Sequence, residues 1–158
     1  VLLLFLLLIV TAAALIVKPD KITVLCSVVL CGCHESMEKR AQREAREYTE
    51  KYCPTPVQNF TRTDSVVFEM DTKTYHYYCS AVGDLDNAKV FDLNRSKIAD
   101  ALLLNVRENT SFRPYKKEGF AFQWTLRSDK DKKTVYFDRK FTSKDYTSSN
   151  RKQYKYKL

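Results

Sequence analysis

The chain has 158 residues and carries 27 lysine and arginine residues against 19 aspartate and glutamate residues, a net charge of +8. With 44% hydrophobic residues and only three glycines and four prolines, it can bury a core and is neither disordered throughout nor collagen-like. Three glycines also leave no room for a glycine-rich phosphate-binding loop, and two histidines argue against a zinc site. These features predict one domain with an appended segment.

The hydrophobic residues are concentrated at the start of the chain. Residues 1–17 are almost wholly apolar, and a second apolar stretch covers residues 22–33. Seventeen residues are at the lower limit for a membrane-spanning helix, and twelve are too few. The second stretch has the order of a signal peptide, with Lys18 and Lys21 before a short apolar run and small residues after it. We therefore expect residues 1–32 to be an export or membrane segment.

The end of this stretch, Leu30-Cys31-Gly32-Cys33, resembles the lipobox of bacterial lipoproteins. That motif consists of an aliphatic residue, two small residues and the cysteine to be acylated, and Cys31 is a tolerable departure from it. The resemblance implies cleavage before Cys33 and a diacylglycerol on its sulfur, because two acyl chains give a stable membrane anchor. The alternative is a retained membrane helix in which Cys26, Cys31 and Cys33 are ordinary small apolar residues.

Residues 36–52 show a helical pattern. Ser36 is the expected N-cap, and apolar residues recur every three or four positions. The apolar face contains Met37, Ala41, Ala45, Tyr48 and Tyr52. Cys53-Pro54 ends the helix, because proline disfavours helical conformation in the residue before it. The polar residues 55–63 are expected to form a loop.

Two strands are expected next, over residues 65–70 and 74–80, joined by a three-residue turn. Alternation along the second strand puts Tyr77 and Cys79 on one face and His76 on the other. A cysteine nucleophile needs a base such as histidine, but residues three positions apart on a strand face opposite sides. The spacing therefore argues against a catalytic pair of His76 and Cys79.

A turn at residues 83–87 precedes a helix expected over residues 94–107. In this helix Ile98, Leu102 and Val106 recur at four-residue spacing. Neighbouring leucines widen the apolar stripe, which indicates that the helix packs against a sheet.

The clearest strand pattern covers residues 120–127. Its apolar positions are Phe120, Phe122, Trp124 and Leu126, which alternate with mostly polar side chains. A charged turn leads to a strand over residues 133–140, in which Val135 and Phe137 are expected to face inward. These two strands predict a hairpin with one buried face and one face exposed to water.

The order of expected elements is α-β-β-α-β-β. Strand pairs that alternate with helices, without crossovers between parallel strands, predict a single α+β domain over residues 33–146. The expected sheet is antiparallel, with helices packed on one face. Residues 147–158 are polar and basic and are expected to form a disordered tail. Its basic side chains, which could contact an anionic surface such as lipid headgroups, are Arg151, Lys152, Lys155 and Lys157. The alternative is a solubilising tail.

Convergent chemical groups are not evident in the sequence. Asp84 and Asp86 lie in a turn without the twelve-residue pattern of a calcium loop. We therefore expect no metal, no cofactor and no enzymatic activity. Cys53 and Cys79 are a candidate disulfide in an oxidising compartment, and two separately buried thiols are the alternative.

These observations predict a lipid-anchored, extracytoplasmic binding or interaction module without catalysis, located in the cell envelope and facing the periplasm or the cell surface. The partners would be the membrane and a protein or glycan of the envelope, since export argues against nucleic acid. The alternative is a small envelope hydrolase that uses the polar face of the sheet. The segment EYTEKYCPTPVQNFTRTDSVVF, after a lipobox, also resembles small uncharacterised lipoproteins of Gram-negative gut commensals, and this resemblance implies no activity for any residue.

Overall fold

The computed structural model describes residues 35–148. The predictions for residues 1–34 and 149–158, which include lipidation of Cys33 and the four cations of the tail, lie outside these residues. The elements in chain order are α3 (Met37–Tyr52), β1 (Thr61–Glu69), β2 (Thr74–Ala81), α4 (Ala88–Glu108), α5 (Arg113–Lys117), β3 (Ala121–Ser128), β4 (Val135–Phe141) and α6 (Ser143–Thr147), with short 3-10 turns at Gly83–Leu85 and Thr110–Phe112. Among the described helices, none is long and apolar enough to cross a bilayer.

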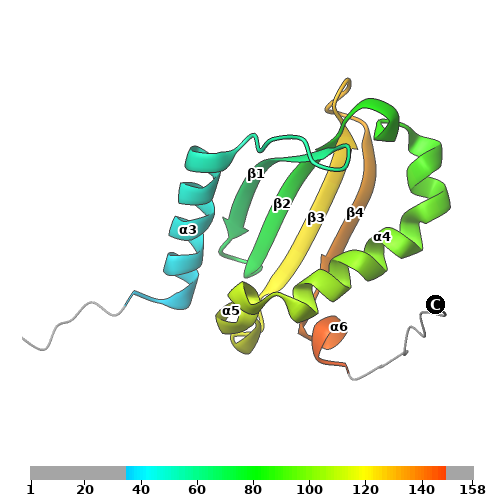
Figure 1. Ribbon diagram of the computed structural model, residues 1–158. Coiled ribbons are helices and arrows are strands. Elements are labelled where there is room, and N and C mark those ends of the chain that lie inside the picture. The colour runs from blue at the N-terminus through cyan, green and yellow to red at the C-terminus, as the bar shows by residue number, and fades with distance from the viewer. Residues whose placement is uncertain (1–34, 149–158) are drawn as a thin grey trace, which may run out of the picture. The chain divides into compact units, whose positions relative to one another are not determined.

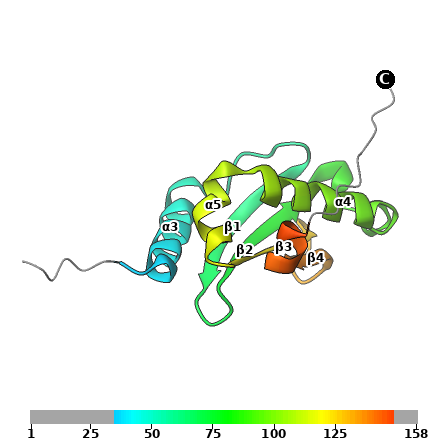
Figure 2. The same cartoon turned by 90° about the horizontal axis from the view of Figure 1, so that it is seen from below.

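The four strands form one sheet in the order β1-β2-β3-β4. The β1–β2 and β3–β4 pairs are antiparallel, and β2 and β3 are parallel. Helices α3, α4 and α5 lie over the same face (Figures 1 and 2). The mixed helix and strand architecture is therefore confirmed. The prediction of an antiparallel sheet is wrong for its central pair, and the predicted element order lacked α5 and α6.

The length of α4 explains the parallel pair. Its 21 residues span about 31 Å, whereas the eight residues of β2 span about 26 Å. The helix therefore carries the chain back to the end of the sheet where β2 begins, and the Ala121 N–H donates to the Lys73 carbonyl at 2.9 Å. Because β3 starts beside the start of β2, the two strands run in the same direction.

The prediction of a helix over residues 94–107 was too short, because α4 begins at Ala88. Asn87 is the N-cap, and its side-chain oxygen accepts a hydrogen bond from the Lys89 N–H at 3.0 Å. The first turn is held by Phe91, which is 1% exposed and stacks on Tyr136 at 5.1 Å between ring centroids. Phe91 lies outside the four-residue repeat, and for that reason the pattern indicated only the second half of the helix.

Helix α3 matches its prediction. Ser36 is the N-cap, and Ala41 and Ala45 are buried. The loop predicted at residues 55–63 is shorter, since β1 begins at Thr61. On α3, the Thr49 hydroxyl donates to the Val66 carbonyl and accepts from the Val66 N–H, both at 2.8 Å. A helix side chain thus satisfies both backbone groups of a residue on the edge strand β1.

The predicted hairpin is confirmed as β3 and β4. Trp124 and Phe137 are buried, but Val135 is 52% exposed, so its inward orientation was wrong. The ladder shifts register between Leu126 and Arg127, and this shift pairs Val135 with Arg127. Val135 therefore belongs to the sheet face that carries no described helix. The predicted tail also began too early, because Thr147 is the last residue of α6.

The sheet face without helices is also less exposed to solvent than its polar pattern indicated. His76 and Thr125 are 7% and 6% exposed, and Ser80 is fully buried. Neighbouring long side chains on the same face cover these residues. We call this surface the open face, because no described helix packs on it.

Candidate functional site

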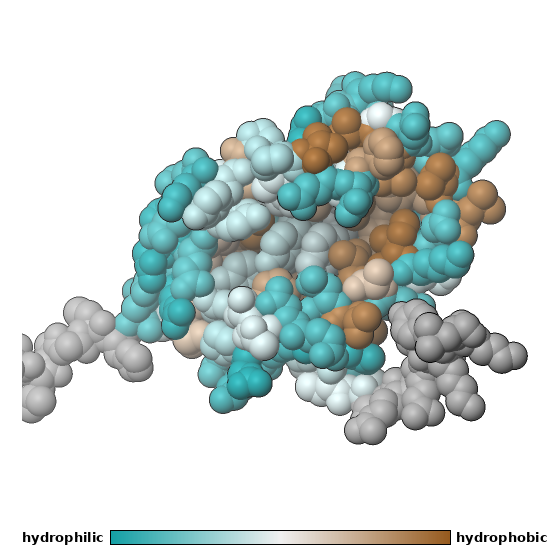
Figure 3. All heavy atoms as spheres, in the orientation of Figure 1, coloured by the Kyte–Doolittle hydropathy of each residue, from teal (hydrophilic) through white to brown (hydrophobic). Residues whose placement is uncertain are grey.

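A cleft on the helix side of the sheet separates α3 from the end of α4 and α5. Figure 3 shows the hollow between α3 and α4, with hydrophobic side chains gathered along α4. The cavity has a volume of about 540 Å³ and is lined by residues from both walls and from β1, β2 and β3. Its aromatic members are Tyr48, Tyr75, Tyr77, Phe112, Tyr115 and Trp124.

The floor of the cleft is a pair of stacked rings. Tyr77 and Trp124 are register partners on the parallel strands β2 and β3, and their ring centroids lie 4.8 Å apart with an angle of 8° between planes. Phe112 lies beside them, 6.4 Å from the Tyr77 ring. Burial raises the pKa of Tyr77, so its phenol stays neutral at physiological pH. The floor is thus flat, aromatic and uncharged.

One end of the cleft is closed by a hydrogen bond between helices. The Tyr115 hydroxyl on α5 donates to the Glu44 carboxylate on α3. Glu44 also forms an ion pair with Arg40 at 2.7 Å. Burial raises the pKa of Glu44, but the hydrogen bonds from Tyr115 and Arg40 outweigh it, and the pKa is lowered. The carboxylate is therefore ionised and occupied, and it braces α3 against α5.

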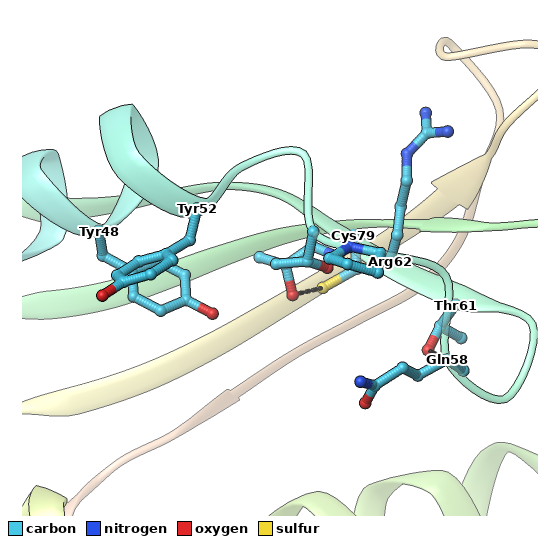
Figure 4. A pocket seen from close by; sticks show the side chains of 9 residues that line it. Tyr48, Tyr52, Gln58, Thr61, Arg62 and Cys79 are labelled. Atoms are coloured by element: carbon cyan, nitrogen blue, oxygen red, sulfur yellow. Dashed lines mark hydrogen bonds between the residues drawn. The ribbon is translucent and has the colours of Figure 1, made fainter.

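A second cavity of about 430 Å³ adjoins the first near the end of α3. It is lined by Tyr48, Tyr52, Gln58, Thr61, Arg62 and Cys79, among others (Figure 4). Tyr48 and Thr63 line both cavities. Tyr48 and Tyr52 are 41% and 52% exposed, although the helical pattern placed both on the buried face of α3. Their exposure shows that this end of α3 borders a hollow rather than a packed core.

Cys53 and Cys79, the cysteines within residues 35–148, are not bonded to each other in the structure. The Cys79 Sγ lies 3.9 Å from the Thr63 Oγ1 (Figure 4), and burial raises the pKa of the Cys79 thiol to about 11. Burial also raises the pKa of the Cys53 thiol. Both are weak nucleophiles at neutral pH. A bond between Cys53 and Cys79 stays a prediction, which alkylation with and without reductant tests.

His76 and Cys79 face opposite sides of the sheet, as their spacing predicted. On the open face, His76 Nδ1 lies 2.8 Å from Glu69 Oε1, and His76 Nε2 lies 2.7 Å from Thr125 Oγ1. The Thr125 hydroxyl in turn donates to Asp138. We call Glu69, His76, Thr125 and Asp138 the histidine relay. This cluster could not be predicted from the sequence, because its members come from four strands whose register was unknown.

A second polar cluster lies on the same face. Arg62 donates to Asp64 at 2.8 Å and to Asp129 at 2.7 Å, and Lys132 Nζ lies 2.6 Å from the Ser80 hydroxyl. Burial raises the pKa of Asp64, but the hydrogen bonds from Ser80 and Arg62 outweigh it and the pKa is lowered. Each of these charges therefore has a partner of opposite sign.

The remaining sequence candidates form no site. Asp84 is exposed, and Asp86 accepts hydrogen bonds from the Tyr136 hydroxyl and the Lys130 N–H. Within residues 35–148, no three histidine, cysteine or acidic side chains are arranged to hold a metal ion. The cleft is the larger of the two cavities described above, and sequence reasoning missed it.

Comparisons with known proteins match the domain that contains this cleft. A family model described as a domain of unknown function (DUF8479) matches residues 36–137. A protein of Pseudomonas aeruginosa described as secreted has a similar structure, with a TM-score of 0.59 and 15% identity over 70% of this chain and 97% of that chain. The pilotin EpsS of the Vibrio vulnificus type 2 secretion system is also similar, with a TM-score of 0.53 and 10% identity over 69% of this chain and 90% of that chain. No curated protein matches the sequence. At these identities the structural likeness shows a shared fold.

Proposed function

The chain belongs to the family defined by the domain of unknown function DUF8479, and we propose that it is a lipid-anchored, extracytoplasmic interaction module without catalysis. Its binding site is the cleft between α3 and α4, and its occupant is a segment of another envelope protein. The observation that carries this proposal is the stacked floor of Tyr77 and Trp124, over which the helices leave a cavity of about 540 Å³.

The chemistry of the cleft favours a peptide segment with a large apolar side chain. A cavity of this size is within the range of about 300–1,000 Å³ that is typical of ligand sites. The aromatic floor offers an uncharged surface to an apolar side chain. Asn105 and Ser111 on the wall offer hydrogen-bonding groups to a peptide backbone. Glu44 is already held by Tyr115 and Arg40, so no free charge competes for the occupant.

The structural neighbours support an envelope role. One is described as secreted and the other as the pilotin of a secretion system, so this fold serves in exported and secretion-system proteins. The lipobox-like sequence before Cys33 supplies the anchor in this proposal. Ser36, the N-cap of α3, follows Cys33 after two residues, which would hold the domain close to the membrane.

The cleft is tested by site-specific photocrosslinking in cells. A photoreactive residue replaces Phe112 in the cleft or, as the control, Val67 on the open face, which is 45% exposed. We expect a discrete adduct with an envelope protein from position 112 alone. A synthetic peptide of the crosslinked segment should then change the fluorescence of Trp124, the only tryptophan in the chain. Equal adducts from both positions, an adduct with a glycan, or unchanged fluorescence would contradict the proposal.

The anchor has a separate test. Cells are fed an alkyne fatty acid, and the label on the protein is measured for the wild type, Cys33→Ala and Cys31→Ala. We expect label on the wild type and on Cys31→Ala, and none on Cys33→Ala. An unlabelled wild type would remove the anchor from the proposal and leave the cleft untouched.

The alternative of a hydrolase on the polar face has a geometric argument against it. The histidine relay places His76 between Glu69 and Thr125, which resembles the order of a catalytic triad. However, the Thr125 hydroxyl donates its proton to Asp138, so it is not available for activation by His76. Incubation with ester, peptide and glycan substrates should therefore give no turnover. Turnover that disappears in His76→Ala would overturn this conclusion.

A further inference from the structure

Arg127 differs from the other cations that surround it on the open face. It lies on β3 in register with Ser80 of β2, and Ser80 is in register with Arg62 of β1. Arg62 forms ion pairs with Asp64 and Asp129. For the side chain of Arg127, the structure gives neither an ion pair nor a hydrogen bond to any residue from 35 to 148, and its Nε is buried without a partner.

The guanidinium of Arg127 is nevertheless held in place. Its Cζ lies 5.0 Å from the centre of the Tyr78 ring, and that ring stacks on His76 at 4.0 Å between centroids. A cation over an aromatic face is attracted to it, which limits the orientations of the guanidinium plane. A buried donor without an acceptor is rare in folded proteins and calls for an explanation. Here the guanidinium is oriented, and no acceptor among the described residues uses its donors.

We propose that Arg127 binds a carboxylate group of a small organic acid. The planar fork of a guanidinium matches a carboxylate through two parallel hydrogen bonds. A doubly charged phosphate fits less well, because the single charge of Arg127 balances only one of its two negative charges.

The surroundings fit a ligand with an apolar part. Val67 and Val135 are 45% and 52% exposed. Val67 pairs with His76, and Val135 pairs with Arg127, so both lie on the open face. The site is therefore one cation over the Tyr78 ring, with Val135 as its register partner on β4 and Val67 further along the same face.

This site does not depend on the proposed function. Tyr78 and Arg127 alternate along their strands with Tyr77 and Leu126, whose side chains lie on the helix side. The cleft and the Arg127 site are thus on opposite faces of the sheet. Failure of one experiment leaves the other interpretation unchanged.

Sodium benzoate is the probe, since it combines a carboxylate with an apolar ring. The full-length protein in detergent micelles is titrated, and binding is measured from the broadening of the benzoate NMR signals. We expect saturable binding that weakens by about tenfold or more in Arg127→Gln, because a charge-assisted hydrogen-bonded pair is lost. Arg127→Lys should weaken binding as well, since lysine keeps the charge but not the planar fork.

Arg139→Gln is the matched control. Arg139 also lies over an aromatic ring, 5.8 Å from the centre of Phe141, but it pairs with Trp124 on the helix side. Its replacement should leave benzoate affinity within about twofold, with both variants melting near the wild-type temperature. Equal losses in Arg127→Gln and Arg139→Gln, absence of saturation in the wild type, or phosphate binding as tight as benzoate would overturn the proposal.

Discussion

Both faces of the sheet contain buried side chains, but different interactions stabilise them. On the helix side, Phe122 is fully buried and stacks on Phe112 at 4.6 Å. On the open face, Ser80 is equally buried and is bonded to Asp64 and Lys132. Alternation along a strand therefore indicates which face is apolar, but it does not indicate that the polar face is wet. Long polar side chains can cover a sheet when each of them has a partner.

The comparison implies different costs of mutation. Removing a ring from the helix side leaves a cavity, whose cost grows with the lost volume. Removing one member of a polar network leaves its partners desolvated and unpaired. Substitutions at exposed positions on either face should lower the free energy of unfolding only slightly.

The largest effect is expected from Phe122→Ala. This side chain contacts the rings of Phe112, Tyr75 and Tyr146. We expect a loss of about 3–5 kcal/mol in the free energy of unfolding, measured by denaturant titration. A loss below about 1 kcal/mol would show that the helices can move in to fill the space. It would contradict the conclusion that close apolar packing stabilises the helix side.

Thr125→Val tests the open face with little change in shape. The substitution removes the hydroxyl that His76 and Asp138 share. We expect a loss of about 1–3 kcal/mol, because both partners stay buried without it. Thr134→Val is the control, since the Thr134 hydroxyl bonds to Asp131 in an exposed turn, and its loss should stay below about 0.5 kcal/mol. Equal losses of stability in Thr125→Val and Thr134→Val would mean that burial does not increase the contribution of the Thr125 hydroxyl.

The histidine relay should make the stability of the fold depend on pH through Glu69. The hydrogen bond from His76 lowers the pKa of Glu69 below its usual value of 4.5, and burial opposes this only in part. A lowered pKa in the folded state contributes stability above the unfolded value, which is lost as the pH falls through the folded pKa. The stability difference between wild type and Glu69→Gln should therefore be full at neutral pH and shrink below pH 4.5. A difference that grows in acid would contradict this sign.

The smallest effect is expected at Val67 on the open face. Its side chain is 45% exposed, so Val67→Ala removes little buried area. The loss in thermal and denaturant stability should stay below about 0.5 kcal/mol. A larger loss would show that the open face has a cover beyond the described residues.

Local patterns predicted the elements better than their arrangement. Ser36, Ala41 and Ala45 fixed α3 from its cap and its apolar face, and alternation predicted the burial of Trp124. The parallel β2–β3 pair could not be predicted, because it depends on the length of α4, and the start of that helix at Ala88 was missed.

The sites depend on contacts that are distant in sequence. His76 meets Glu69 seven residues away and Thr125 49 residues away, and neither contact follows without strand register. The cleft was missed for a related reason. The helix expected over residues 94–107 was predicted to pack against the sheet through a widened apolar stripe, but Leu104 is 53% exposed, so the helix covers only part of the sheet.

The hydrogen bonds of Thr49 to Val66 have a consequence for self-association. An edge strand with free backbone groups can recruit strands from other molecules, which leads to aggregation. On β1 the Thr49 hydroxyl occupies both backbone groups of Val66, and on β4 the Arg95 guanidinium donates to the Tyr136 carbonyl at 3.0 Å. Helices thus cover a point on each outer strand. We therefore expect these contacts to hinder growth of the sheet from one copy to the next at both edges.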